Sequence, residues 1–538
     1  MKAIHLIPAL PFAAVAAGLV FLVALRFKRA RWAALALYTL SVPSLAILLY
    51  RFWDHHVGPD AFSIWQFSIS PASISFLLPL SVVSPLLLWA TWKKGPADRK
   101  ETASYALACF GLASALAAVM TEHLFLLSGL LTVATWCAAG AAILRGRKAG
   151  RLLPFMFPPG LADLCMVLGV LFLYLYDPTR GLFFPAAPLE PSGMAAVSCA
   201  LMLSAALLRL GCFPFHRWMA GVSRGGKDLR LTHILAVDLS LGTFLLFTVS
   251  RLFFVWGGVW MWVCLGIAAA TLLELARELL HASGREEIWG LVCASLGAGI
   301  VMVTAPGGQA AAVAARVGLW AGVPALALIE LGSEATRGMS WARVAGGASL
   351  LGLPPLAGFA WLWLGFHVLS GAFEGGVTVV YLGAIPLFFA ASLIAGTTAL
   401  LVPGNAAEKA PTQLAAASAG FLTACCVSVG LYAGTAIDFL MREYGMPLDV
   451  PFGSWTTLGW AVLICCGLAV IVASAWAHRR GDRRGEENRA FRALPLVAQK
   501  WAFPFPLLDK SRFRVAVVLS ELSIYLAWIT VMVYLGIK

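Results

Sequence analysis

The sequence has few charged residues for its length. Only 12% of the 538 residues are Asp, Glu, Lys or Arg, whereas 60% are hydrophobic. Soluble globular domains typically have about 25% charged residues, so the composition excludes a soluble globule. It is typical of a polytopic helical membrane protein, whose apolar segments of about 20 residues cross the hydrocarbon core of the bilayer.

The sequence also lacks the patterns that hold a metal, a cofactor or a catalytic centre. Its eleven cysteines fall within apolar segments, and none forms a Cys-x-x-Cys pair or a Cys/His cluster with the spacing of metal ligands. No phosphate-binding loop or nucleophile–base pair is recognisable. We therefore expect no metal and no cofactor in this chain.

The basic residues are distributed among short connections. The formal net charge of +13 would, in a soluble protein, suggest a nucleic acid partner. Here the basic residues gather in alternate connections between apolar runs, at 26–31, 93–100, 145–151 and 217–230. The positive-inside rule places these connections in the cytoplasm. We expect both termini on the non-cytoplasmic side of a cell inner membrane, and no nucleic acid partner.

Apolar runs long enough to cross a bilayer recur along the whole chain. About sixteen segments reach the required length of about 20 residues, which predicts an all-α polytopic fold. The first run resembles a signal peptide at its start, but its full length and the arginines after it fit an uncleaved spanning helix better. The predicted spans lie near 3–25, 32–50, 71–92, 103–120, 123–144, 157–176, 193–213, 231–255, 257–281, 288–304, 312–332, 344–371, 377–402, 412–440, 455–477 and 514–536.

Proline interrupts two of these runs. The first run carries Arg209 and then breaks in the stretch 213–218, Phe-Pro-Phe-His-Arg-Trp; the second breaks in the stretch 354–359, Pro-Pro-Leu-Ala-Gly-Phe. Proline has no N–H donor and clashes with the preceding turn, and a bilayer tolerates such a break only where protein or water satisfies the freed backbone. Either break alone could be an ordinary kink, but two in corresponding positions indicate a transporter built from repeats. The break positions are Pro214, His216, Pro354, Pro355 and Gly358.

These motifs, together with the Gly-x-x-Asp run at 160–164, resemble those of the antiporter-like membrane subunits of respiratory complex I, the largest of these subunits above all. Related subunits occur in multisubunit cation/proton antiporters, membrane-bound hydrogenases and energy-coupled inorganic-carbon uptake complexes. The resemblance covers residues 68–401. It implies two inverted five-helix repeats, each with a broken helix, a hydrated chain of lysines, histidines and glutamates at the membrane midplane, and assembly with other subunits.

The predicted spans and the resemblance divide the chain into four parts. N-terminal transmembrane helices occupy 1–102, the first repeat 103–255 and the second repeat 257–402. C-terminal transmembrane helices follow at 412–538, with a basic cytoplasmic connection at 478–513. That connection is the longest polar stretch, and a solvated loop is the simplest interpretation of it, although it could also bind anionic lipid or a partner subunit.

The chain departs from the family pattern where the proton path would lie. Arg209 stands in place of the family's lysine, and a guanidinium does not release its proton. The glutamate expected in the helix after Glu122 is missing from 129–135, and the lysines expected near Pro324 and after Phe359 are absent. The sequence therefore predicts a retained scaffold in which much of the family's proton path is missing.

Six residues remain candidates for an ion pathway: Arg209, His233, Asp238, Glu274, Glu278 and Glu330. His233 and Asp238 follow the first break but lie on different faces of a helix, so they are either relay members or side chains satisfied by neighbouring helices. Glu274 and Glu278 share one face, where a solvated helix end is favoured over proton exchange with an imidazole. Glu330 follows an apolar run, and for Asp163 we expect a role in helix packing.

Three functions remain open. The chain is a subunit that moves protons or monovalent cations in an energy-coupling complex, or the membrane subunit of an inorganic-carbon uptake complex, or a non-conducting anchor for a partner. A free-standing enzyme has little support, although the resemblance leaves open a place in an NADH–quinone oxidoreductase-like or hydrogenase-like complex. The expected partners are other membrane subunits and the lipid bilayer.

Overall fold

The structure is a computed structural model. It describes residues 9–26, 30–39, 62–64, 67–69, 71–91, 99–144, 149–178, 188–190, 193–223, 237–253, 258–281, 285–334, 340–371, 384–401 and 413–441. All of these belong to one compact unit, Met1–Ser454 with Met532–Lys538. His233, the predicted spans at 455–477 and 514–536, and the basic connection between them lie outside the described residues.

The N-terminal part combines helices with a short hairpin. Strands β1 and β2 pair antiparallel, with Ser63 opposite Ser68, a small departure from the all-α prediction. The predicted span at 71–92 contains a π-helical segment that begins at Pro79, where the missing proline N–H interrupts the regular α-helical hydrogen bonds. The elements are α1 (Ala9–Ala24), α2 (Ala30–Thr39), β1 (Phe62–Ile64), β2 (Phe67–Ile69), α4 (Pro71–Leu78), η2 (Pro79–Val83) and α5 (Ser84–Thr91).

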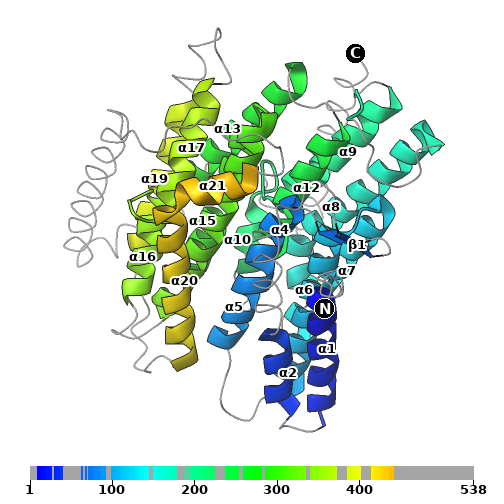
Figure 1. Ribbon diagram of the computed structural model, residues 1–538, viewed down its shortest axis with the longest axis vertical. Helices are drawn as coiled ribbons and strands as arrows, with labels where there is room; N and C mark the ends of the chain where they lie inside the picture. The colour runs from blue at the N-terminus through cyan, green and yellow to red at the C-terminus, as the bar shows by residue number, and fades with distance from the viewer. Residues whose placement is uncertain are drawn as a thin grey trace, which may run out of the picture. The chain divides into compact units, whose positions relative to one another are not determined.

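A first group of helices follows, cyan to green in Figure 1. Successive helices pack against one another, α6 on α7, α7 on α8, α8 on α9, and α9 on α12. These contacts bury the small and apolar residues of α6 and α9, whose charged residues lie only in the first turn of α6 and at the last position of α9. The bounds are α6 (Arg99–Met120), α7 (Leu124–Leu144), α8 (Ala149–Tyr176), α9 (Met194–Arg209), α10 (Arg217–Ser223) and α12 (Leu239–Leu252).

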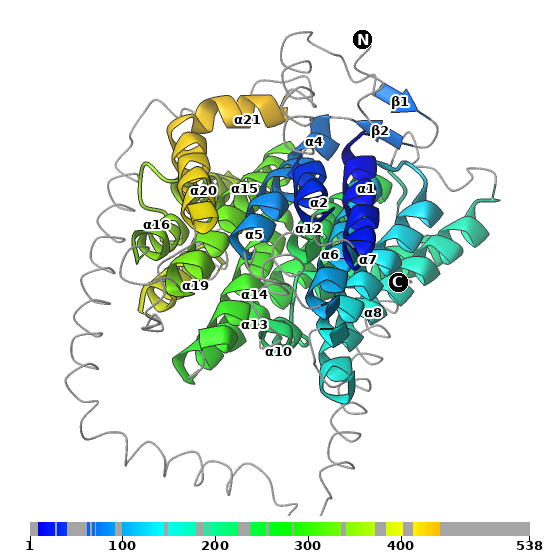
Figure 2. The same cartoon turned by 90° about the horizontal axis from the view of Figure 1, so that it is seen from below.

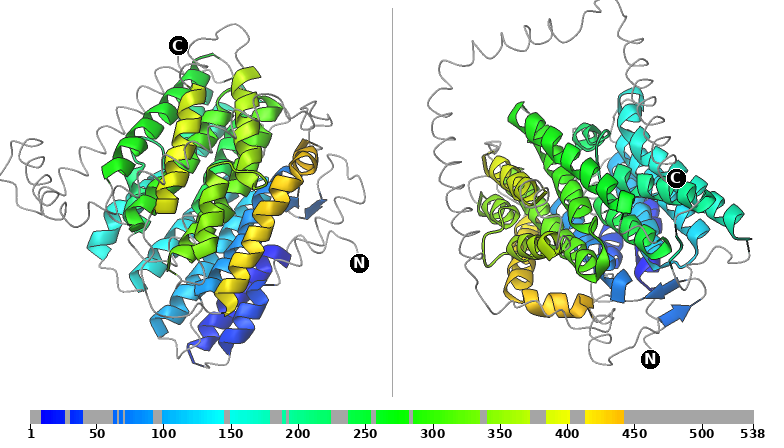
Figure 3. Two further views of the ribbon diagram at one scale, coloured as in Figure 1. Left: turned by 90° about the vertical axis from the view of Figure 1, so that its left-hand side faces the viewer. Right: turned by 90° about the horizontal axis from the view of Figure 1, so that it is seen from above.

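A second group of helices is drawn green to yellow in Figure 1, and α13 packs on α14, α14 on α15, α15 on α16, and α16 on α19. Helix α15 lies at its centre, since 94% of its apolar window is buried and it contacts α14, α16, α17 and α20. The two groups meet where α10 packs on α14 and α12 on α15, and their helices run roughly side by side (Figure 3). The bounds are α13 (Gly258–His281), α14 (Arg285–Thr304), α15 (Gly308–Glu334), α16 (Ser340–Leu350), α17 (Ala357–Gly371) and α19 (Ile385–Leu401).

The last described helices correspond to one predicted span. The sequence predicts a single span at 412–440, but the structure divides it into α20 (Gln413–Leu431) and α21 (Ala433–Met441). The two helices are bent by 81° at the junction, so that α21 turns across the end of α20 (Figure 2). Helix α20 packs on α15 and α5.

The described residues contain seven helices that are long and apolar enough to cross a membrane, or eight if the bent pair forms one span. Five shorter apolar helices of 10–17 residues accompany them. The chain is therefore a multi-pass membrane protein. The predicted count of about sixteen spans at about 20 residues each is not reached in the described part, where the breaks shorten two spans.

Candidate functional site

The two helix breaks have the same backbone conformation. Helix α9 ends with Gly211 at φ 68° and α16 with Gly352 at φ 74°, a left-handed conformation that favours glycine. After each glycine the next N–H returns to the helix: Cys212 N donates to the Leu207 carbonyl at 2.9 Å, and Leu353 N to the Ala348 carbonyl at 3.0 Å. Both ends are therefore Schellman caps, which satisfy carbonyls that a helix end would leave unpaired.

Backbone packing shelters both breaks. The peptide bonds before Pro214 and Pro355 are cis. A Cβ atom on Gly297 of α14 would overlap the carbonyl of Leu210, and one on Gly430 of α20 would overlap the carbonyl of Pro355. Neighbouring helices therefore approach the backbone of both breaks closely through glycine, the kind of protein contact that an interrupted helix in a bilayer needs, while Phe213 and Pro355 themselves are exposed.

A buried arginine and two carboxylates meet beside the first break. Arg209 is the last residue of α9 and its side chain is fully buried. Its Nη1 donates to Asp238 Oδ1 at 2.8 Å, while Nη2 donates to Asp163 Oδ1 and, at 2.8 Å, to Thr135 Oγ1. The Leu131 carbonyl accepts a further bond from Nη2 at 3.2 Å. Side chains or backbone from α7, α8 and the start of α12 therefore converge on one guanidinium.

Both carboxylates of this cluster form ion pairs with Arg209. Asp238 occupies the N-cap position of α12 but makes no side-chain capping hydrogen bond, although aspartate is among the preferred N-cap residues. It pairs with Arg209 instead. With both carboxylates ionised, the cluster has one positive and two negative groups, hence a formal charge of −1. Buried charge of this kind is stable only when paired and hydrogen-bonded.

Sequence reasoning singled out Arg209 and Asp238 but missed the role of Asp163. We expected that side chain to serve helix packing, whereas it is buried and pairs with Arg209. The available signal was an aspartate within an apolar span, which is a functional candidate by default. On α7, where the resemblance led us to expect a glutamate, Thr135 and the Leu131 carbonyl contact Arg209, so the carboxylates come from other helices.

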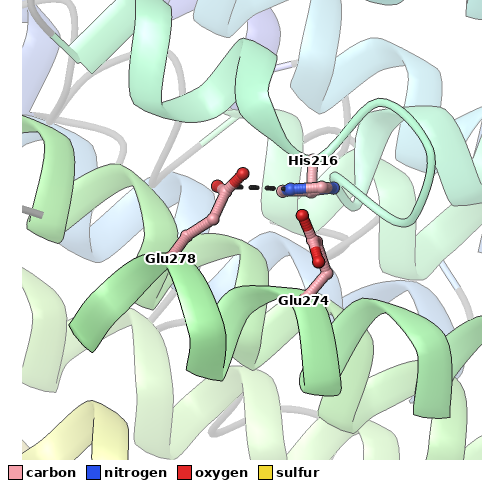
Figure 4. A group of neighbouring side chains, drawn as sticks. All are labelled: His216, Glu274 and Glu278. Carbon is pink, nitrogen blue, oxygen red and sulfur yellow. Dashed lines mark ion pairs between the residues drawn. The ribbon is translucent and has the colours of Figure 1, made fainter. Parts of the chain in front are cut away.

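A second polar cluster joins the break to α13. His216 Nε2 lies 3.3 Å from Glu278 Oε2, and Arg217 Nη2 lies 2.5 Å from Glu278 Oε1. Glu274 accepts two bonds from Arg277, one of them from Nε at 2.9 Å. The sequence favoured a solvated helix end, and Arg277 is indeed 62% exposed. Glu278, however, is only 15% exposed and faces the buried imidazole (Figure 4).

The remaining candidates lie elsewhere. Glu330 of α15 is buried, and the hydrogen bonds and ion pairs that Arg209 makes within the described part of the chain reach neither Glu330 nor Glu274 nor Glu278. Arg316 is buried with its guanidinium 5.3 Å from the Phe247 ring, at a cavity of about 330 Å³. The residue that corresponds to Arg209 at the second break is Leu350, the last residue of α16.

Several solved structures share this fold. No family model and no curated protein matches the sequence. A chain of the Mrp complex from Dietzia sp. DQ12-45-1b is similar, with a TM-score of 0.71 and 18% identity over 98% of this chain and 63% of that chain. A chain of the archaeal membrane-bound sulfane sulfur reductase has a TM-score of 0.71 and 16% identity, over 96% of this chain and 100% of that one.

A chain of respiratory complex I from Thermus thermophilus is also similar, with a TM-score of 0.58 and 19% identity over 79% of this chain and 98% of that chain. The predicted resemblance to antiporter-like subunits is thus confirmed at the level of the fold. The chain spans less than two thirds of the Mrp chain it matches.

Proposed function

We propose that the chain is an antiporter-like membrane subunit of a multisubunit complex and that it moves protons or monovalent cations. The observation that carries the proposal is the fully buried Arg209 held between the carboxylates of Asp163 and Asp238 at a helix break. Ionisable groups within a membrane bundle are costly and mark ion paths. The shared fold with chains of the Mrp complex and respiratory complex I supports the same conclusion.

The charge of the cluster suggests how it would act. A guanidinium keeps its proton, so Arg209 positions the carboxylates and does not relay protons. An uncompensated buried charge costs several kcal/mol, and the cluster has one more carboxylate than guanidinium. It would therefore take up one proton or one monovalent cation. Exchange of that single charge between the two sides of the membrane is the proposed transport step.

We further infer that the helices form two inverted five-helix repeats, α6 to α12 and α13 to α19. Supporting this are the matching order of packed helices and the two breaks with the same pattern of capping hydrogen bonds. In each proposed repeat the broken helix is the fourth. Inverted repeats place an ion site at the interrupted helices near the membrane midplane, and Arg209 ends one such helix.

A second candidate function is a non-conducting anchor for a partner subunit. Leu350 at the second break favours it, because no charge corresponds there to Arg209 at the first break. An inorganic-carbon uptake complex is compatible with either function. The subunits that co-purify with the chain would identify the complex.

Transport by the assembled complex tests the proposal. The complex is reconstituted in vesicles, and proton and sodium flux are measured for the wild type, Asp238→Asn and Asp163→Asn. Each variant leaves Arg209 one ionised partner, so we expect normal assembly and at least a tenfold loss of flux. Asp438→Asn is the matched control, because Asp438 is an exposed aspartate on α21. Wild-type flux in both cluster variants would contradict the proposal, and absence of flux in the intact wild-type complex would favour the anchor.

A further inference from the structure

We propose that His216, Glu274 and Glu278 form a binding site for a divalent transition-metal ion, with Zn²⁺ as the type ion. Glu274 and Glu278 are one turn apart on α13, and His216 projects toward them from the segment before α10 (Figure 4). One ligand atom from each side chain lies within 4.8 Å of the other two. An imidazole with two carboxylates is a donor set that suits zinc and other first-row metals.

The burial of His216 and its lack of hydrogen bonds indicate a ligand site. His216 is 3% exposed, and neither of its ring nitrogens has a hydrogen-bond partner among the described residues. Its Nε2 forms an ion pair with Glu278 Oε2 at 3.3 Å. A buried polar group without a hydrogen bond costs free energy. Two ligand atoms on one tetrahedral zinc ion would be roughly 3.3 Å apart, which is the separation already present.

The arginines determine how readily a metal could bind. Nη2 of Arg217 pairs with Oε1 of Glu278 at 2.5 Å, so the other carboxylate oxygen, Oε2, faces the His216 imidazole. Arg277 occupies both oxygens of Glu274, so it competes directly with a metal for that carboxylate. Because Arg277 is 62% exposed, its guanidinium can turn into solvent. Glu274 would then be free to move toward the other two ligands and complete the site.

This site is assembled by the fold and not by a local sequence pattern. His216 and the two glutamates come from distant parts of the sequence, which is why ligand spacing predicted no metal. The Phe213 N–H donates to Thr271 Oγ1 at 2.8 Å and holds α13 against the break, so the ligands are positioned before a metal binds. The proposal does not depend on ion transport, because it concerns equilibrium binding of the metal alone.

Titration with Co²⁺ tests the site. The full-length chain is purified in detergent, stripped with a chelator and titrated while the visible spectrum is recorded; Zn²⁺ binding is measured by equilibrium dialysis. We expect one bound ion with a spectrum of nitrogen and oxygen ligands. His216→Gln and Glu278→Gln should weaken binding at least about tenfold, since even the loss of an outer-shell partner costs about 10–100-fold in metal affinity.

Two further variants sharpen the test. Arg277→Gln should tighten binding severalfold because it removes the competing guanidinium, a result that a plain salt-bridge network would not produce. Glu287→Gln, in the first turn of α14, removes a carboxylate outside the cluster and should leave the affinity unchanged. If size-exclusion chromatography shows that His216→Gln misfolds, Glu274→Gln, which replaces a partly exposed side chain, makes the same comparison.

Three results would overturn the proposal. One is that the wild-type chain binds no Co²⁺ or Zn²⁺. Another is a thiolate charge-transfer band, which would show that cysteines hold the ion. The third is equal affinity of the wild type and of the folded ligand variants, since the ion would then be bound elsewhere.

Discussion

The two helix breaks have the same backbone conformation and different chemistry. Gly211 and Gly352 have the same left-handed conformation, and the hydrogen bonds around them correspond. At the equivalent last helical position the first break has Arg209 with two carboxylates, whereas the second has Leu350. Capping glycines and prolines therefore determine the shape of a break, and its charge is a separate property. The two breaks therefore differ in the last residue of the helix, which is charged at the first break and apolar at the second.

The largest effect is expected when the first break is made like the second. Arg209→Leu leaves two buried carboxylates without their cation, and removing one partner of a buried ion pair costs about 3–5 kcal/mol. The midpoint of thermal unfolding of the purified chain should fall sharply. The triple variant with Asp163→Asn and Asp238→Asn should recover most of the loss. An unchanged midpoint for Arg209→Leu alone would mean that the ion pairs do not stabilise the bundle.

The reverse exchange should have a somewhat smaller effect. Leu350→Arg places a charge at the second break, where the equivalent helical position is filled by the buried, apolar Leu350. Charged residues at the centre of a membrane helix cost about 2.5–3.5 kcal/mol on insertion scales. Leu350→Met serves as the volume-matched control and should cost below about 1.5 kcal/mol. Equal unfolding midpoints for the two variants would show that this break already accommodates a charge.

A third prediction concerns the shape that the breaks share. A Cβ atom on Gly358 would overlap the Ser349 carbonyl, whereas one on Gly160 of α8 would meet no atom within 4 Å. Overpacking in a filled core costs about 1–3 kcal/mol, so Gly358→Ala should lower the unfolding midpoint. Gly160→Ala should leave it unchanged or raise it slightly, because glycine weakens a helix interior. The same response to both substitutions would refute close packing at the second break.

The smallest effect is expected at Thr135. Thr135→Val removes one hydrogen bond of Arg209 and leaves both carboxylates in place, so about 0.5–1.5 kcal/mol should be lost. Thr132→Val is the control on the same helix, because the Thr132 hydroxyl donates to the Ser128 carbonyl just as the Thr135 hydroxyl donates to the Leu131 carbonyl. Chemical denaturation compares the two variants. A larger loss in the control would show that Thr135 contributes nothing through Arg209.

The hydropathy of the sequence and the positions of its prolines predict much of the fold, but they predict less of the candidate site. The helix bounds of α7 and α13 lie within a residue of the prediction, because apolar runs and charged ends locate spans directly. No proline near the bend between α20 and α21 could have predicted it from the sequence. Gly430 packs there on the Pro355 carbonyl. Such a contact depends on tertiary packing that sequence periodicity does not contain.

The same limit applies to side-chain partners. Helical spacing correctly placed Glu274 and Glu278 on one face, yet the pairing of Glu278 with His216 depends on how α13 meets the break. Asp163 and Asp238 reach Arg209 from different helices. A sequence identifies residues that need a partner when buried, but the choice among partners is made by the packing of helices.

The excess carboxylate beside Arg209 has a consequence for energetics. A bound proton or cation at this cluster would be an elementary charge within the membrane electric field. Moving one such charge through the full potential is worth about 2.3 kcal/mol per 100 mV, and a site inside the bundle feels a fraction of that. Its occupancy would therefore depend on voltage as well as on ion concentration, and Arg209, which keeps its charge, would set the potential at which it fills.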